Sequence, residues 1–320
     1  MTKYNILVTG VGAIIGYGII QSLKTSQLQA NIVATDIYED AYGAALADTF
    51  YQGVLASSPD FIDFINDIVA KEKIDLIIPG IEQDLYALFQ NKEKIHTKVV
   101  MNTDLCITLS KDKWATYSYL KDNFTLDLIP TLQNVTFDEC VKTLGLPFLL
   151  KPKSSYASKG IQTISSKREF DFYTESQLGQ LIFQKIIGTT NSEFTVSVFG
   201  DGKGNFFDSI ILKRALSGEG ATSKAIVVQS PIIEKYVTEL VKVLLPVGPT
   251  NIQLRLENDV PYLLEINPRI SSACSLRMAF GYNEPEMCID YFVNQKAIQP
   301  SPKKTGSAVR FITDYIKYDK

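Results

Sequence analysis

The chain has 320 residues, and its composition of 45% hydrophobic and 21% charged residues is typical of a globular protein with a sizeable core. Its net charge of −3 argues against a nucleic-acid-binding surface, while a lone histidine and four cysteines without a CxxC pair argue against a zinc centre or a Ser-His-Asp triad. The opening residues lack the apolar segment of a secretion signal and no apolar run reaches membrane-spanning length, so we expect a cytoplasmic protein that enters no membrane.

The first third of the chain alternates between short apolar segments and segments with helical spacing. The apolar segments predict strands at Tyr4–Thr9, Asn31–Asp36, Asp75–Pro79 and Lys98–Met101. Helices are predicted from a glycine-rich turn, Gly10–Gly18, to about Leu23 and again at Phe61–Lys71. Such alternation predicts a doubly wound parallel sheet, an α/β domain that we assign to residues 1–110.

A helix predicted around Asp112–Asn123 opens the second segment, residues 111–190, in which the pattern becomes α+β. Its strands are predicted at Pro147–Lys151, Ile161–Ser165 and Leu181–Ile186, with a helix at Lys167–Ser176. Long strands dominate residues 191–320 and indicate an antiparallel sheet. They are predicted at Glu193–Phe199, Asn205–Arg214, Lys224–Gln229, Asn251–Leu256 and Tyr262–Asn267, with helices at Ile232–Leu245, Ser272–Phe280 and Pro285–Asn294.

Glycines at positions 10, 12, 16 and 18 lie in the first strand–turn–helix unit. Glycine lets a backbone turn tightly and lets a phosphate approach a helix N-terminus. A dinucleotide fingerprint would need a third glycine where Ile15 stands, although Asp36 closes the second strand as a ribose-binding acid would. Two interpretations stay open: a cofactor site, and a turn that packs the helix on the sheet or contacts a substrate. We favour the second because stronger nucleotide chemistry follows.

Lys151 ends an apolar strand and is followed by a loop of small residues that runs through Ser158 to Gly160. An ammonium fixed at a strand end can neutralise the α- and β-phosphates of a nucleotide. The loop can fold over the nucleotide and donate backbone N–H groups to phosphate oxygens. The alternative is an exposed lysine in front of an ordinary hairpin.

A strand leaves the second segment, the chain turns at Gly188, and the next strand begins at Glu193. A purine can sit against this hinge and hydrogen-bond to its backbone, while Glu193 can accept hydrogen bonds from ribose hydroxyls. The alternative is two strands joined by a polar loop.

The segment that follows residue 250 predicts a hairpin with its turn near Asn258-Asp259. On its second strand, Glu265 and Asn267 are two residues apart and share one face, and pairing would set Gln253 across from them. Such hard oxygen ligands suit magnesium held between protein and phosphates. Arg269 follows, placed to hold a γ-phosphate or the charge that develops during its transfer. The alternative is a solvated hairpin face, for which this run of residues is unusual.

In this order, the Lys151 loop, the hinge and the segment Gln253…Glu265-x-Asn267-Pro-Arg269 resemble the ATP-grasp superfamily, in its branch like the carbamoyl-phosphate-synthetase large subunit. The resemblance covers about residues 111–295, and residues 1–110 resemble the pre-ATP-grasp domain of that group. It implies ATP held between two α+β subdomains with antiparallel sheets. It implies nucleotide contacts from Lys113, Lys151, Ser158, Gly160, Gln184, Lys185, Ile186, Ile187 and Glu193, contacts to one or two Mg²⁺ or Mn²⁺ ions from Gln253, Glu265 and Asn267, and catalytic roles for Lys151 and Arg269. Lys213 or Arg214 is expected to add a phosphate contact, with the choice between them left open.

The implied reaction is carboxylate–amine ligation. A small-molecule carboxylate attacks the γ-phosphate to form an acyl phosphate, an amine displaces the phosphate, and ADP and phosphate leave. Because many relatives are dimers, a homodimer is expected as well.

Two other functions stay open. An NAD(P)-dependent oxidoreductase would use the glycine turn, Asp36 and Tyr117-x-x-x-Lys121, although this last spacing also suits a plain contact along a helix. The other is a non-catalytic nucleotide-binding protein, and the presence of Glu265, Asn267 and Arg269 argues against it.

Overall fold

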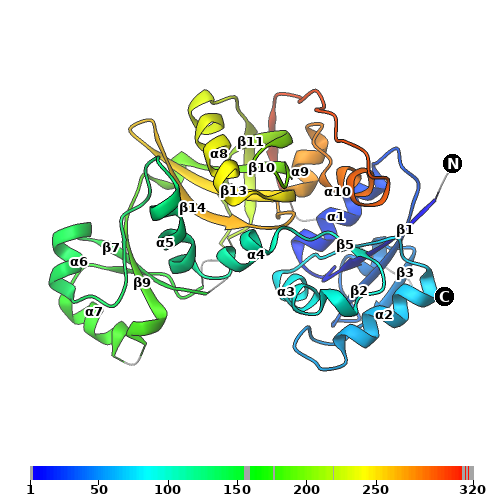
Figure 1. Ribbon diagram of the computed structural model, residues 1–320, viewed down its shortest axis with the longest axis horizontal. Helices are drawn as coiled ribbons and strands as arrows, with labels where there is room; N and C mark the ends of the chain where they lie inside the picture. Colours follow the sequence, from blue (N-terminus) through cyan, green and yellow to red (C-terminus); the bar gives the residue numbers. More distant parts are fainter. Residues whose placement is uncertain are drawn as a thin grey trace.

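The computed structural model describes residues 3–154, 159–175, 177–218, 220–311, 314 and 316. Three sheets follow one another along the long axis of the molecule (Figure 1). A parallel five-stranded sheet lies at one end, an antiparallel six-stranded sheet in the middle, and an antiparallel four-stranded sheet at the other end. This arrangement confirms the predicted fold class. We keep the proposed division into residues 1–110, 111–190 and 191–320, which assigns one sheet to each segment.

The parallel sheet has the strand order β3-β2-β1-β4-β5. Its central strand is β1 (Tyr4–Thr9), in which Ile6, Leu7 and Val8 are fully buried because apolar clusters cover both faces of the sheet. The other elements are β2 (Ala30–Asp36), β3 (Thr49–Gln52), β4 (Leu76–Ile78), β5 (Lys98–Val99), α1 (Ile14–Lys24), α2 (Phe61–Glu72) and α3 (Glu82–Gln90), with 3-10 helices at Ala44–Leu46 and Lys92–Lys94.

The glycine-rich turn is shorter than predicted, since α1 begins at Ile14 and includes Gly16 and Gly18. A side chain at Gly16 would bring its Cβ within 2.5 Å of the carbonyl oxygen of Gly10. The missing side chain therefore lets the first turn of α1 lie directly on the loop that leaves β1, as the second interpretation of this segment requires.

The four-stranded sheet has the order β6-β9-β7-β8, and phenylalanines fill its core, among them Phe148, Phe170 and Phe183. Its elements are β6 (Thr131–Leu132), α6 (Phe137–Leu144), β7 (Phe148–Pro152), β8 (Gln162–Ile164), α7 (Lys167–Thr174), a 3-10 helix at Leu178–Gln180 and β9 (Leu181–Lys185). Helix α6 is not among the elements predicted from the sequence, although a capping box of Thr136 and Glu139 marks where it begins.

Two helices, α4 (Asp104–Ser110) and α5 (Lys113–Asn123), join the first two segments. The side chain of Asp112 caps α5 by accepting hydrogen bonds from the backbone N–H groups of Trp114 and Ala115. This cap fixes Lys113 as the first helical residue. Leu120 packs α5 on the apolar cluster of the six-stranded sheet, so the helix lies between the two antiparallel sheets.

The six-stranded sheet has the order β14-β13-β10-β11-β12-β15. Its strands are β10 (Glu193–Asp201), β11 (Phe206–Leu216), β12 (Thr222–Val227), β13 (Val247–Glu257), β14 (Val260–Asn267) and β15 (Ser307–Val309), with a 3-10 helix at Thr190–Ser192. Its helices are α8 (Pro231–Leu244), α9 (Cys274–Ala279) and α10 (Glu284–Cys288). The prediction of one long helix at Pro285–Asn294 is wrong, because α10 ends at Cys288 and a π-helical turn follows at Ile289–Val293.

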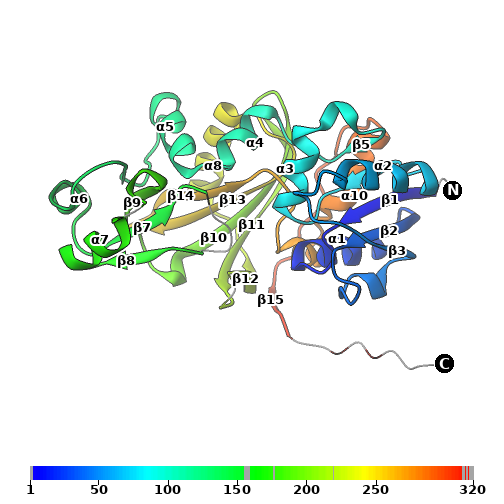
Figure 2. The same cartoon turned by 90° about the horizontal axis from the view of Figure 1, so that it is seen from below.

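The parallel sheet and the six-stranded sheet are packed into one body (Figure 2). One apolar cluster joins β1 and α1 to Phe199 of β10 and to Ile270. At the same boundary Asn102 donates a hydrogen bond from Nδ2 to Thr250 Oγ1 at 2.7 Å. The walls of a site between these two sheets are therefore held in fixed positions. Within the described ranges, no helix is both long and apolar enough to cross a bilayer.

Candidate active site

The β13–β14 hairpin carries the acidic and amide side chains of the site. Its register sets Gln253 opposite Glu265 and Asn251 opposite Asn267, which confirms the predicted pairing. The strands are joined by two residues with left-handed backbone, the predicted Asn258-Asp259 turn, with φ values of 52° and 61°. Alternation along each strand then places these four side chains near one another on the sheet.

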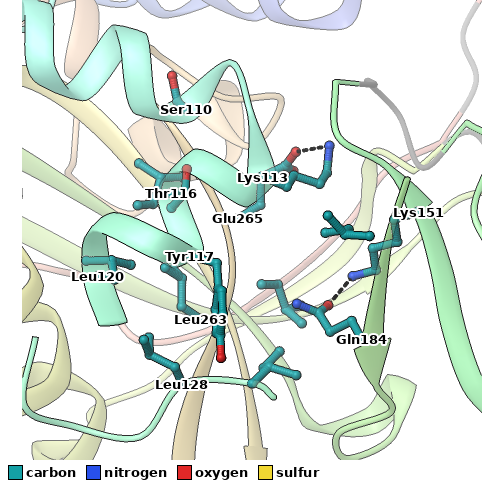
Figure 3. A pocket seen from close by; sticks show the side chains of 14 residues that line it. Ser110, Lys113, Thr116, Tyr117, Leu120, Leu128, Lys151, Gln184, Leu263 and Glu265 are labelled. Atoms are coloured by element: carbon teal, nitrogen blue, oxygen red, sulfur yellow. Dashed lines mark hydrogen bonds and ion pairs between the residues drawn. The ribbon is translucent and has the colours of Figure 1, made fainter. Parts of the chain in front are cut away.

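One pocket, here named the lysine pocket, lies between α5, β7, β9 and β14 (Figure 3). Lys113 Nζ lies 4.0 Å from Glu265 Oε1, and Lys151 Nζ donates a hydrogen bond to Gln184 Oε1 at 2.5 Å. The rest of the lining is mostly apolar, from Leu120, Leu128, Ile129, Ile182, Leu263, Leu264 and Ile266, with Ser110, Thr116 and Tyr117. Two ammonium groups at one end of an apolar pocket suit a ligand with a flat apolar base and a chain of phosphates.

The charged groups of the lysine pocket are perturbed by their burial. Lys151 is 7% exposed, and this burial lowers its pKa to about 8, while the nearby Glu265 carboxylate acts in the opposite direction. Burial also raises the pKa of Glu265, against the attraction of Lys113. Since the direct partner of Lys151 is an uncharged amide, an incoming anion would complete its pairing.

A second cavity of about 280 Å³, here named the interdomain pocket, lies between the parallel sheet and the six-stranded sheet. Ala13, Ile14, Ile15, Ile81, Glu82 and Gln83 form one wall, and Arg214, Leu216, Gly220, Ala221, Asn251, Gln253, Glu265, Asn267, Arg269, Ser271 and Ser272 form the other. Glu265 lines both pockets, so the lysine pocket and the interdomain pocket meet at this residue.

Arg269 crosses from the six-stranded sheet to the N-terminal domain. Its Nη2 donates hydrogen bonds to Glu82 Oε1 at 2.5 Å and to Asn267 Oδ1 at 3.0 Å, and its Nη1 donates to the carbonyl oxygen of Ile270. The guanidinium is thus held beside the hairpin, in the wall of the interdomain pocket. Its contact with a transferring phosphate stays a prediction.

Glu193 is placed differently from its expected position at a ribose. It is 4% exposed, and its two carboxylate oxygens accept hydrogen bonds from Arg214 and Arg255 at 2.9 Å and 3.0 Å. A buried carboxylate already paired with two guanidinium groups is poorly placed to accept hydrogen bonds from ribose hydroxyls, and it does not line either pocket described above. The structure instead makes Glu193 an anchor for the two arginines.

The choice between Lys213 and Arg214 is decided by alternation along β11. Lys213 is exposed, whereas Arg214 is buried on the opposite face and donates to Gln253 Oε1 at 2.8 Å. Arg214 also lines the interdomain pocket, so it is the better candidate for an additional phosphate contact.

The hinge residues are divided between the pocket and its surroundings. Gln184 lines the lysine pocket, but Lys185, Ile186 and Ile187 are not part of its lining in the described chain. Lys185 is exposed and its backbone N–H donates to the carbonyl oxygen of Pro130, while Ile187 is buried. Gly188, with φ of 57°, donates its N–H to Glu257 Oε1 at 3.0 Å, which ties the hinge to β13.

The predicted phosphate loop is described in part. Ser158 lies outside the described residues. Gly160 has φ of 77° and lies against Pro152, the residue that follows Lys151.

The predicted metal ligands supply one carboxylate and two amides. The Gln253 and Asn267 amide oxygens accept hydrogen bonds from Arg214 and Arg269, whereas the Glu265 carboxylate has a loose 4.0 Å ion pair. Among the described residues, no group of three His, Cys, Asp or Glu side chains could hold a metal by itself. This donor set fits Mg²⁺, which is usually held by one or two carboxylates together with nucleotide phosphates.

The N-terminal glycine turn is held together by Asp36. Its Oδ2 accepts a hydrogen bond from the Gly12 N–H at 2.7 Å, and its Oδ1 accepts one from the Tyr38 N–H at 3.1 Å. An acid used in this way is not free for a dinucleotide ribose. Tyr117 lines the lysine pocket, away from this turn, so the features of the oxidoreductase interpretation do not converge.

Several residues of the site are not predicted from the sequence. Thr131 holds Gln184, Arg255 holds Glu193, and Asn251 lines the interdomain pocket. Of these residues only Asn251 could have been found from the sequence, because it lies two residues before Gln253 on β13 and therefore shares its face.

Two family models match the chain. Residues 185–315 match the family described as ATP-grasp in the biosynthetic pathway with Ter operon, and residues 6–102 match the PylC-like N-terminal domain. The arginine-specific carbamoyl phosphate synthase large chain of Halalkalibacterium halodurans is 23% identical in an alignment of 293 residues that covers 84% of this chain and 27% of that protein. This chain thus spans about a quarter of the length of that relative.

Solved structures share the fold at low sequence identity. N5-carboxyaminoimidazole synthetase from Staphylococcus aureus, complexed with ADP, has a TM-score of 0.73 and 19% identity over 94% of this chain and 81% of that chain. L-amino acid ligase from Bacillus licheniformis has a TM-score of 0.66 and 15% identity, and the match covers 92% of this chain and 75% of that chain. The biotin carboxylase domain of Hydrogenobacter thermophilus 2-oxoglutarate carboxylase was solved as a dimer with MgADP and bicarbonate. It has a TM-score of 0.71 and 18% identity, and the match covers 95% of this chain and 73% of that chain. The two family models thus assign residues 185–315 to an ATP-grasp family and residues 6–102 to a PylC-like N-terminal domain, and the solved structures share the fold that the three sheets form.

Proposed function

We propose that the chain is an ATP-dependent ligase that activates a small carboxylate as an acyl phosphate for attack by an amine, with release of ADP and phosphate. The observation that supports this most directly is the position of Glu265, which lines both the lysine pocket and the interdomain pocket. A nucleotide in the first pocket and a carboxylate in the second would meet at this residue, and holding two reactants in contact supplies much of the catalysis of such a transfer.

The lysine pocket would bind the nucleotide. Lys113 and Lys151 would neutralise the phosphates, and Gln184 would orient Lys151 through its hydrogen bond. Apolar side chains such as Ile182 and Leu263 would enclose the base.

The interdomain pocket would bind the carboxylate beside the cations that stabilise transfer. Arg269 and Arg214 would balance the charge that develops on the moving phosphoryl group. Mg²⁺, held by Glu265 with the amide oxygens of Gln253 and Asn267, would neutralise the phosphate oxygens when ATP is bound, and Mn²⁺ could replace it. A cytoplasmic homodimer remains part of the proposal.

Trapping the acyl phosphate tests the reaction without knowledge of the amine. The purified protein is incubated with MgATP, hydroxylamine and pools of carboxylates, bicarbonate included, and hydroxamate and ADP are measured together. ADP release that depends on one pool, with an equal amount of hydroxamate, is the expected result. Mass spectrometry with pooled amines in place of hydroxylamine then identifies the product.

Lys151→Ala and Glu265→Ala should each lower the rate of hydroxamate formation at least about 100-fold, because Lys151 would neutralise the phosphates directly and Glu265 would hold the Mg²⁺ that does so. Lys235→Ala and Glu234→Ala, at exposed positions of α8, make the same changes of charge and should leave the rate unchanged. Full activity of either pocket variant, with circular dichroism showing a native fold, would contradict the assignment. Tight binding of NADH and no binding of ATP in fluorescence titrations would instead favour the oxidoreductase.

A further inference from the structure

The interdomain pocket contains the starts of two helices that lack side-chain caps. Ala13 precedes α1 and Ile81 precedes α3, and neither side chain can accept a hydrogen bond from the helix. Within the described part of the chain, the backbone N–H groups of Ile14 and Ile15 have no acceptor. Unsatisfied N–H groups and the helix dipole together favour an anion at this position.

Two buried amides in the opposite wall make an independent case for the same kind of ligand. Asn251 is 0% exposed, and its Oδ1 accepts hydrogen bonds from Thr195 and Arg277. Because a guanidinium can only donate, the amide oxygen is fixed on that side, and Nδ2 is left without a partner among the described residues. Asn267 is in the same state, since its Oδ1 accepts from Arg269 and its Nδ2 has no partner there.

These buried donors need acceptors, since burying an unpaired N–H costs free energy that a ligand can restore. The pocket holds two carboxylates, and Glu82 is already paired with Arg269. The amide N–H groups of Asn251 and Asn267 therefore lack oxygen acceptors, and the carboxylate of a bound acid would supply them.

Apart from Glu82 and Gln83, the side chains in the wall that carries the helix starts are apolar. Ile14, Ile15 and Ile81 line it with partly exposed side chains, and Leu216 contributes to the pocket from β11. Ile15 occupies the position of the third glycine of a dinucleotide fingerprint, so the pocket has a branched side chain where that fingerprint has none. A ligand in this pocket therefore meets hydrogen-bond donors on the hairpin wall and at the first turn of α1, and branched aliphatic side chains beside that turn.

We infer that the interdomain pocket selects a carboxylic acid with an apolar, aliphatic substituent. The carboxylate is held by the donors of the hairpin wall and of the first turn of α1, and the substituent packs on Ile14, Ile15 and Ile81. This inference rests on the proposed function, because the same acid would be the group that is activated.

The test compares acids of matched size. Leucine is paired with asparagine, and 4-methylpentanoate with glutarate, in the hydroxamate assay with MgATP. We expect the apolar member of each pair to have a kcat/KM at least about 10-fold higher. Ile15→Asn should remove most of this preference, whereas Ile232→Ala, at a position of α8 that is 47% exposed, should retain it.

Calorimetric binding of the same acids, and of the ATP analogue AMP-PNP with Mg²⁺, separates failure of the inference from failure of the proposed function. If hydroxamate forms but polar acids are preferred, or Ile15→Asn keeps the wild-type preference, the inference is wrong and the function stands. If hydroxamate forms with no acid, the proposed function fails, and the inference is then judged by binding alone. Apolar acids that bind wild type at least about 10-fold more tightly than Ile15→Asn support it, and equal or no binding overturns it.

Discussion

Lys151 is a buried ammonium that sits between an amide partner and the Glu265 carboxylate. Since burial lowers its pKa to about 8, it loses its proton near the upper end of the physiological range. Phosphates bound beside it would favour the charged form, so the free protein must take up a proton in order to bind ATP above that pH. We expect the dissociation constant of AMP-PNP to be flat below pH 7 and to rise as the pH passes 8, by up to about 10-fold per pH unit.

Lys151→Arg is the matched variant for this effect. A guanidinium remains charged throughout this range, so binding by the variant should not weaken between pH 7 and pH 9, whatever its absolute affinity. Titrations at constant ionic strength measure both proteins. A wild-type dissociation constant that does not change over this interval would show that Lys151 stays charged or lies away from the phosphates.

At the scale of residues, a motif on one strand is easier to predict than a group of residues from several strands. The face shared by Glu265 and Asn267, and their pairing with Gln253, follow from strand alternation and one short turn. Glu193 is different, because its partners come from β11 and β13, which flank β10 in the sheet. The order of strands decides that two arginines reach this carboxylate, and one sequence does not reveal that order.

At the scale of elements, the β13–β14 hairpin depends on a two-residue turn in which both residues have left-handed backbone. Asn258 and Asp259 tolerate this conformation, but glycine is the preferred second residue of such a turn. Asp259→Gly should therefore raise the free energy of unfolding by about 0.5 kcal/mol, measured by urea denaturation. The exposed Asp67→Gly in the middle of α2 should lower it by about 0.5–1 kcal/mol. Two changes of the same sign would show that the turn is not under conformational strain.

The sequence predicts elements that bury a regular apolar pattern and misses those that do not. β3 lies at the edge of its sheet with none of its four residues fully buried, and β6 has two residues. In α3 the buried apolar residues are Leu85 and Leu88, too few to make a periodic pattern. Such elements are held by their neighbours rather than by their own pattern, so their prediction needs the tertiary structure.

At the scale of the whole molecule, the ion pair of Arg269 with Glu82 joins residues 187 positions apart in the chain. It connects the start of α3 to the end of the β13–β14 hairpin, and the Arg269 and Glu82 side chains are 14% and 22% exposed. A pair this well shielded can fix the position of the guanidinium across the domain boundary. Glu82 is therefore a positioning residue for Arg269, and no motif in either segment predicts the contact.

Glu82→Gln keeps the size of the side chain but removes the charge that holds Arg269. Because a small displacement of a charge-stabilising group weakens transition-state binding, we expect kcat for hydroxamate formation to fall about 10- to 100-fold. The KM for ATP should change less, since Lys113 and Lys151 are in another pocket. The carboxylate of Glu82 also raises the pKa of Glu265, so its removal should shift the acidic limb of the pH–rate profile to lower pH.

Asp104→Asn is the control, because it makes the same acid-to-amide change in the exposed Lys92–Asp104 pair. Exposed pairs contribute little, so stability and kinetics should be close to wild type. A purely structural role for Glu82 would lower stability without moving the acidic limb, whereas positioning at the site moves the limb and lowers kcat together. If the limb stays in place and kcat is unchanged, the boundary contact does not act on the reaction, and the two domains meet at this pocket without being coupled through Arg269.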